Sequence, residues 1–337
     1  MSTLVFQALR RLADGRFHSG EDIAHELGRS RATLSEALKR TDAMGLELFS
    51  VPGKGYRLAE PIEFLDVDKV LALAGHAATK LRLEVVEETD STNSQMLARA
   101  MIGAPSGSCL AAEWQSAGRG RRGRSWVTAL GGSLSFSLLW RFDRGAGHLA
   151  GLSLAVGIAV VRALRAHGVA GAQVKWPNDV LVDGEKLAGI LVEASGEMSG
   201  PSVAVIGVGI NYRLGERERD AIDQPVTDVV SHAASAHARN ALLAAVLAEL
   251  VEVLEAFEQS GFAALRDEWR SLHAFHRRMV RILPPQGEPY DAEVLDIAND
   301  GTLLIGVNGK TVKLASAEIM GSDPIVPSVR GGANNGV

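Results

Sequence analysis

The sequence contains a single cysteine, Cys109, among 337 residues. One thiol cannot form a disulfide within the chain, which excludes the disulfide framework of small secreted domains. Apolar runs are short as well: the longest, residues 149–161, is interrupted by Ser153 and falls below the roughly 18 residues that a membrane span requires. The N-terminus lacks a basic segment followed by an apolar stretch and a cleavage site. These absences predict a cytoplasmic protein without a membrane helix.

An excess of positive charge is also missing. The chain has 35 Lys and Arg against 40 Asp and Glu, a formal net charge of -5. A cluster of cations is therefore a local feature of this chain. With 46% hydrophobic residues, the chain is long enough to bury a large core and is expected to form two or three domains.

Such a cluster occurs in residues 113–126, where four arginines alternate with glycines. Glycine lets a ligand approach the backbone closely, and guanidinium groups bind phosphate, so the stretch predicts a site for an anionic ligand. Most arginine runs are solvated patches or nucleic-acid footprints. Here the apolar residues 109–112 and the alternating residues 133–138 flank the run, which indicates a loop between two core strands and favours a ligand-facing role.

The same letters match the dinucleotide fingerprint G-x-G-x-x-G, with Asp143 roughly 20 residues further on. That motif requires a helix directly after the glycines, because the helix N-terminus holds the pyrophosphate. Only seven residues separate Gly123 from Gly131, and a strand with period-two alternation follows. The sequence therefore disfavours a dehydrogenase.

Residues 1–62 are predicted to form a winged helix-turn-helix DNA-binding domain. Apolar periodicity and the potential caps Ser19 and Ser30 indicate three helices before residue 41, and two short strands are expected within residues 46–58. The third helix would enter the major groove, with Lys54 on the wing. The predicted DNA-contacting residues are Arg29, Arg31, Ser35, Lys39, Arg40 and Lys54.

The charge of this region supports DNA binding only weakly. Residues 1–60 hold nine Lys or Arg and eight Asp or Glu, a net of +1, and Glu36 lies on the expected reading face. Binding by a monomer should be feeble. A protein-interaction module remains the alternative interpretation.

The rest of the chain is predicted to be α+β. Residues 63–80 form a helical linker and residues 81–272 a domain with a mixed or antiparallel sheet, in which Asp183-Gly184 marks a hairpin. Strands are expected at residues 108–114, 133–141, 174–176, 180–182, 188–194 and 203–209, and helices at 64–78, 92–101, 148–167 and 240–259. Residues 273–325 predict a small antiparallel barrel, and residues 326–337 a disordered tail.

Three further segments accompany the arginine loop: Asp-Ser-Thr-Asn at residues 90–93, Lys-Trp-Pro-Asn-Asp at 175–179, and Gly-Glu-Lys-Leu-Ala-Gly-Ile-Leu at 184–191. In this order, they resemble the biotin protein ligases. Together with the winged helix, the chain is similar from about residue 19 to about residue 321 to the bifunctional subgroup that combines ligase and biotin operon repressor.

The resemblance implies a class II aminoacyl-tRNA synthetase-like ligase domain followed by an SH3-like barrel. It implies that ATP, with Mg²⁺, activates biotin to biotinyl-5'-AMP, and that biotin then passes to a lysine of the biotin carboxyl carrier protein of acetyl-CoA carboxylase. The adenylate would also serve as corepressor. A homodimer would form when the adenylate or DNA binds, and the DNA partner would be the operator.

The same resemblance assigns roles to residues, and the metal ligands stay unassigned. The catalytic candidates are Lys186, Arg121, Asp179 and Arg119. Arg121 and Lys186 are expected where the biotin carboxylate meets phosphate, Arg119 at the acyl phosphate or pyrophosphate. The biotin site would comprise Ser91, Thr92, Asn93, Gln115, Gly118, Arg119, Arg121, Lys186, Gly189, Ile190 and Leu191. The nucleotide site would comprise Arg119, Arg121, Arg124, Trp126, Lys175, Asn178, Val208 and Asn211.

Three alternatives stay open. A lipoate ligase shares the fold and the adenylate strategy, a biotin-sensing repressor would lack ligase activity, and a ligase could have lost its operator. The arginine loop and the Lys-Trp-Pro-Asn-Asp segment favour biotin over lipoate. Lys186 and Asp179 favour an enzyme over a pure sensor.

Overall fold

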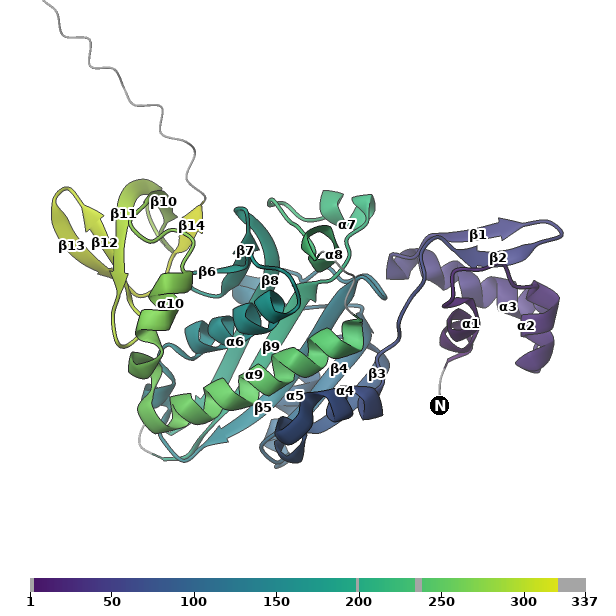
Figure 1. The fold of residues 1–337 in the computed structure, drawn as a ribbon, viewed down its shortest axis with the longest axis horizontal. Coiled ribbons are helices and arrows are strands. Elements are labelled where there is room, and N and C mark those ends of the chain that lie inside the picture. The colour runs from purple at the N-terminus through teal and green to yellow at the C-terminus, as the bar shows by residue number, and fades with distance from the viewer. Residues whose placement is uncertain (1–2, 198–199, 234–237, 321–337) are drawn as a thin grey trace, which may run out of the picture.

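The structure is a computed structural model that describes residues 3–197, 200–233 and 238–320 (Figure 1). Along the chain it comprises a small helical domain with a β-hairpin, a large central sheet covered by helices, and a second, smaller sheet. The tail predicted at residues 326–337 lies outside the described residues. Among the described residues, no helix is both long enough and apolar enough to cross a membrane.

The N-terminal domain has the predicted winged helix-turn-helix architecture. Ser19 and Ser30 cap the second and third helices, because their hydroxyls accept hydrogen bonds from the backbone N–H groups of Asp22 and Thr33. The inward side chains, among them Phe6 and Leu34, are fully buried in a separate core. The elements are α1 (Leu4–Leu12), α2 (Gly20–Glu26), α3 (Arg31–Leu38), η1 (Lys39–Met44), β1 (Leu48–Val51) and β2 (Gly55–Leu58).

The central sheet has seven strands in the order β3-β4-β5-β9-β8-β7-β6. Only β3 and β4 run parallel to each other, so the predicted mixed sheet is confirmed. The strands are β3 (Arg82–Thr89), β4 (Ser108–Gln115), β5 (Ser133–Phe142), β6 (Gln173–Lys175), β7 (Asp179–Val182), β8 (Glu185–Gly196) and β9 (Ser202–Asn211). The strand β3 was not predicted, because it is an edge strand without a fully buried residue and its four charged residues obscure the apolar alternation.

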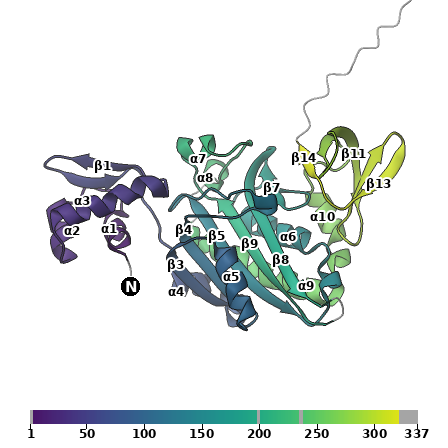
Figure 2. The ribbon, with the colours of Figure 1, turned by 180° about the vertical axis from the view of Figure 1, so that it is seen from behind.

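Helices cover both faces of this sheet, as the two opposite views show (Figures 1 and 2). The helices α4 (Val67–Ala74), α6 (Leu152–Ala166) and α9 (Arg239–Ser260) pack in the main core on one face. The helix α5 (Thr92–Met101) packs on the other face through Met96.

Two predicted helices are interrupted in the structure. The one expected at residues 148–167 is split at Gly151 into η4 (Ala146–Leu149) and α6, because Gly151 has a φ of 81° and a Cβ there would lie 2.7 Å from the Phe262 side chain. The helix expected at residues 64–78 consists of α4 and the 3₁₀ helix η2 (Gly75–Lys80).

The C-terminal part is a five-stranded antiparallel sheet with the order β13-β12-β11-β10-β14. Its strands are β10 (Met279–Leu283), β11 (Tyr290–Ile297), β12 (Leu303–Val307), β13 (Lys310–Leu314) and β14 (Glu318–Met320). Among the described residues, β13 and β14 are the two edge strands and are not hydrogen-bonded to each other. The strands of the expected barrel therefore pair as an open sheet.

Short helices complete the chain. They are η3 (Arg121–Gly123) in the arginine loop, α7 (Glu216–Asp220) and α8 (Val229–His232) after β9, and η5 (Phe262–Ala264) and α10 (Arg266–Leu272) before the C-terminal sheet.

The winged domain is attached to the central domain by polar and apolar contacts. Leu130, which follows the arginine loop, is buried in the core of the winged domain. Arg217 of α7 pairs with Asp42 at 2.7 Å, and Arg40 pairs with Glu88 of β3 at 2.9 Å. The small domain is thus held beside segments that lead into the main cavity.

Candidate active site

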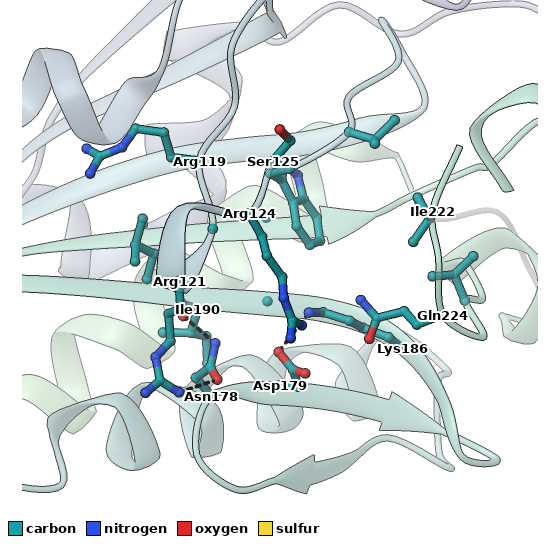
Figure 3. Close-up of a pocket in the computed structure, with 18 of the residues that line it drawn as sticks. Arg119, Arg121, Arg124, Ser125, Asn178, Asp179, Lys186, Ile190, Ile222 and Gln224 are labelled. Carbon is teal, nitrogen blue, oxygen red and sulfur yellow. Dashed lines mark hydrogen bonds and ion pairs between the residues drawn. The ribbon is translucent and has the colours of Figure 1, made fainter. Parts of the chain in front are cut away.

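A cavity of about 860 Å³ lies between the arginine loop, the central sheet and the C-terminal sheet. It collects the four sequence segments that were singled out above, although they are spread over residues 90–191. The predicted site residues that line it are Ser91, Thr92, Asn93, Gln115, Arg119, Arg121, Arg124, Trp126, Lys175, Asn178, Asp179, Lys186, Gly189, Ile190, Leu191, Val208 and Asn211. Figure 3 shows this cavity at close range.

One end of the cavity is formed by the N-terminus of α5, where polar side chains are buried. The Ser137 hydroxyl of β5 donates to Oδ1 of Asn93 at 2.8 Å and lies 2.8 Å from the Thr92 hydroxyl. The backbone N–H of Thr92 donates to Oε1 of Gln115 at 2.7 Å. Ser91 is the N-cap of α5, so its hydroxyl accepts from the Ser94 N–H. Buried hydroxyls and amides of this kind can fix the orientation of a mostly apolar ligand.

The floor of the cavity is made of glycines beneath an indole. A side chain at Gly189 or Gly209 would collide with the Trp126 ring. Gly118 does not itself line the cavity, but a Cβ there would lie 2.5 Å from the Trp126 carbonyl oxygen. The indole Nε1–H is buried without a hydrogen-bond partner among the described residues, which leaves a donor for a ligand.

The central ion pair joins Lys186 and Asp179 at 2.9 Å, with both side chains 15% exposed. Lys186 Nζ also lies 5.8 Å from the centre of the Trp126 ring. Asn211 holds the backbone of β8 at Lys186, since its Nδ2 donates to the Lys186 carbonyl oxygen at 3.2 Å and to that of Thr227 at 3.1 Å. The ammonium of Lys186 can stabilise developing negative charge, and the carboxylate of Asp179 beside it can accept a proton.

Burial affects two more cations of the cavity. It lowers the pKa of Arg121, and the charge of Arg122 adds to this effect. Arg121 Nη1 donates to Oδ1 of Asn178 at 2.9 Å, and Asn178 Nδ2 in turn donates to the Ile190 carbonyl oxygen at 2.9 Å. Burial likewise lowers the pKa of Lys175. An incoming phosphate would raise both pKa values again, because it stabilises the charged form of each group.

The remaining arginines of the loop are held by carboxylates. Glu318 of β14 pairs with Arg124 and, at 3.2 Å, with Arg122. Burial alone would raise the pKa of Glu318, but the bond from Arg124 and the nearby cations outweigh burial and lower it. Arg119 pairs with Glu193 at 3.0 Å, and its guanidinium points away from Lys186 and Asp179 (Figure 3). In this structure the guanidinium of Arg119 is therefore directed to Glu193, and its role at the phosphate stays a prediction.

Residues 85–211 match the biotin/lipoate A/B protein ligase family, and residues 5–57 match a helix-turn-helix domain. Over 311 residues the chain is 38% identical to the bifunctional ligase/repressor BirA of Salmonella typhimurium, covering 91% of this chain and 94% of the relative. The chain belongs to the biotin/lipoate A/B protein ligase family.

Other members of the family support the assignment. The biotin-[acetyl-CoA-carboxylase] ligase of Mycobacterium tuberculosis is 34% identical over 253 residues, which cover 74% of this chain and 92% of that protein. A biotin protein ligase from Aquifex aeolicus, solved in complex with biotin and ATP, has a TM-score of 0.60 and 24% identity, over 72% of this chain and 99% of that one. That likeness shows the fold.

Several lining residues of this family member were not identified from the sequence. Ser135 and Ser137 belong to the alternating stretch at residues 133–138, but their inward direction depends on the register of β5 against β9. The segment 221–226 and Glu318 also line the cavity. No local pattern marks Glu318, because it reaches the cavity only through the packing of the C-terminal sheet.

The predicted DNA-contacting residues differ in their surroundings. Arg29, Arg31 and Lys54 are exposed. Lys39 pairs with Glu36 at 2.6 Å, and Arg40 is engaged by Glu88 of the central domain at 2.9 Å. Ser35 is half-buried. The free cations of the third helix thus lie at its N-terminal end.

Proposed function

We propose that the chain is a biotin protein ligase that also represses transcription. Biotin and ATP give biotinyl-5'-adenylate and pyrophosphate, and biotin then passes to a lysine of the biotin carboxyl carrier protein of acetyl-CoA carboxylase, with release of AMP. The observation that carries this proposal is the convergence of Lys186, Arg121 and Asp179 on one cavity. Full-length likeness to bifunctional ligase/repressors supports it.

In the first step, an oxygen of the biotin carboxylate attacks the α-phosphorus, and the bond to the bridging oxygen of pyrophosphate breaks. Both reactants are anions, so charge repulsion is a large part of the barrier. Lys186 and Arg121 are proposed to stabilise the negative charge at the junction of carboxylate and phosphate. Arg124 and Lys175 would hold the nucleotide phosphates.

The ligand orientation follows from the chemistry of the walls. The biotin bicycle would lie at the α5 end, where Thr92, Asn93 and Gln115 are buried, and the nucleotide would lie towards Asn178 and Asn211. Mg²⁺ is expected to arrive with ATP, because it binds through phosphate oxygens and keeps several waters. Within the described segments, no group of three or more His, Cys, Asp or Glu side chains could hold it alone.

In the second step, the acceptor amine attacks the acyl carbon of the adenylate and AMP leaves. A free lysine has a pKa near 10.4, so at pH 7.4 only about one in a thousand is neutral, a deficit of roughly 4 kcal/mol. Asp179 is proposed to orient this amine and accept its proton. Its ion pair with Lys186, the residue proposed to act in the first step, supports this role.

The reaction is tested by the exchange of labelled pyrophosphate into ATP, with biotin in one sample and lipoate in another. Exchange that depends on biotin and not on lipoate supports the ligase. Exchange with lipoate alone would show that lipoate, and not biotin, is the substrate. Tight biotin binding without exchange would indicate a biotin sensor without ligase activity.

Repression is proposed to follow from dimer formation on the adenylate, which would place two winged domains on a palindromic operator. The winged domain supports this part of the proposal through its exposed Arg29, Arg31 and Lys54. Sedimentation with and without biotin and ATP tests it: a doubled mass with both ligands is expected, and an unchanged mass would count against it.

A further inference from the structure

A small polar cluster at the rim of the cavity joins three segments that are far apart in the sequence. Glu193 of β8 accepts from Nδ2 of Asn93 at 2.7 Å and from both terminal nitrogens of Arg119 at 3.2 and 3.0 Å. Ser94 also contacts Arg119 Nη1 at 3.3 Å. One carboxylate therefore ties the first turn of α5 and the start of the arginine loop to the central sheet.

The cluster sets the orientation of Asn93. Its Oδ1 lies 2.8 Å from the Ser137 hydroxyl, and its Nδ2 donates to Glu193. The side chain is buried, and the absence of a Cβ at Gly207 makes room for Oδ1. Asn93 is therefore held on opposite sides by Ser137 and Glu193, so loss of the carboxylate would free one side of the amide.

The cluster also anchors the start of the arginine loop. The two-pronged bond from Arg119 to Glu193 fixes the residue next to Gly118. The Gly118 carbonyl oxygen accepts from the Trp126 N–H at 2.8 Å, and the Trp126 ring covers Gly189 and Gly209. An anchor at Arg119 thereby supports the indole above the cavity floor.

We infer that Glu193 is a positioning residue for biotin, which it serves by holding Asn93 and Arg119 in place. This inference rests on the proposed ligase function. Glu193 does not line the cavity, and it acts through the two residues that it binds. Arg121, Arg124 and Lys186 have other partners, Asn178, Glu318 and Asp179, so the phosphate end of the site does not depend on Glu193.

The test is Glu193→Gln in the full-length protein. Gln keeps the size of the side chain and an acceptor for Asn93, but removes the charge that binds Arg119. We expect the dissociation constant for biotin without ATP, and the KM for biotin, to rise about threefold to tenfold. The KM for ATP and kcat of pyrophosphate exchange should stay within about twofold of wild type.

Glu84→Gln is the matched control. Glu84 forms a similar two-pronged pair with Arg99 of the same helix α5, at 2.6 and 3.3 Å, away from the cavity. It should leave biotin binding unchanged. Arg119→Gln should reproduce the rise in the dissociation constant for biotin, and the double variant should raise that constant by no more than about a further twofold, because both single changes break the same ion pair.

Several results would overturn the inference. Biotin affinity of Glu193→Gln equal to wild type, an equal effect of Glu84→Gln, or additive effects of the two single variants each contradict it. A lower kcat together with higher KM values for both biotin and ATP would indicate a general structural defect and would also contradict the inference. Absence of pyrophosphate exchange in the wild type would instead refute the ligase proposal on which it rests.

Discussion

The arginine loop and residues 29–40 of the winged domain, which contain α3, each carry four basic residues within about a dozen positions. In the loop, each arginine has a fixed partner: Glu193 for Arg119, Asn178 for Arg121, and Glu318 for Arg122 and Arg124. In residues 29–40, Lys39 and Arg40 are paired with carboxylates, and Arg29 and Arg31 are exposed.

This difference separates two uses of positive charge. Cations that are held in place around a cavity need little reorganisation when charge develops, so they suit a reaction. Exposed cations are screened by salt and suit reversible contact with a polyanion. Substitutions in the two regions should therefore change different quantities.

The largest effect is expected at the centre of the cavity. Lys186→Met should lower the kcat/KM for adenylate formation by about 10²- to 10³-fold, because it removes a preorganised cation from the reacting phosphate. Pyrophosphate exchange measures this step. Lys69→Met, at an exposed position outside the cavity, is the control. If both substitutions change kcat/KM equally little, Lys186 has no role in adenylate formation.

Asp179→Asn separates the two half-reactions. Transfer of biotin from preformed adenylate to the carrier should slow about 10²-fold, since the acceptor amine loses its proton acceptor. Adenylate formation should stay largely intact. Single-turnover transfer and pyrophosphate exchange measure the two steps, and an equal loss in both would show that Asp179 acts mainly through its pair with Lys186.

On the winged domain, Arg31→Gln should weaken operator binding about fivefold and lower the slope of log K against log salt concentration by about one. Arg40→Gln should change both less, because Glu88 already occupies its guanidinium. Fluorescence anisotropy at several salt concentrations measures the slopes. The contrast between the two regions fails if Arg40→Gln has the larger effect.

The smallest effect is expected at the edge of the cavity. Glu318→Gln should raise the KM for ATP about threefold, because Arg122 and Arg124 lose the carboxylate that holds them near the nucleotide phosphates. The KM for biotin should not change. Steady-state kinetics with each substrate varied in turn measures both, and a selective change in the KM for biotin would contradict the proposed division of the cavity.

Local patterns predicted much of the architecture. Helix periodicity and caps indicated the three N-terminal helices, and Asp183-Gly184 indicated the hairpin between β7 and β8. The interruption at Gly151 was not predicted, because it depends on contact with Phe262 more than a hundred residues later in the chain. The edge strand β3 was not identified since its charged residues mask the alternation.

The candidate site shows the same limit. Four motifs contain about half of the lining residues, because their residue types are unusual at that spacing. The partners Glu193 and Glu318 carry no local signal, since each meets the arginine loop only after the sheets have formed. The direction of Arg119 follows from such a partner, and sequence alone could not give it.

The central claim is that this cavity activates biotin and passes it to a carrier lysine. The most direct measurement is the mass of an apo biotin carboxyl carrier domain after incubation with the full chain, ATP, Mg²⁺ and biotin, with lipoate in a parallel reaction. A gain of one biotin on one lysine, absent with lipoate, is the predicted result. An unchanged mass with biotin, or a gain of lipoate, would contradict the claim.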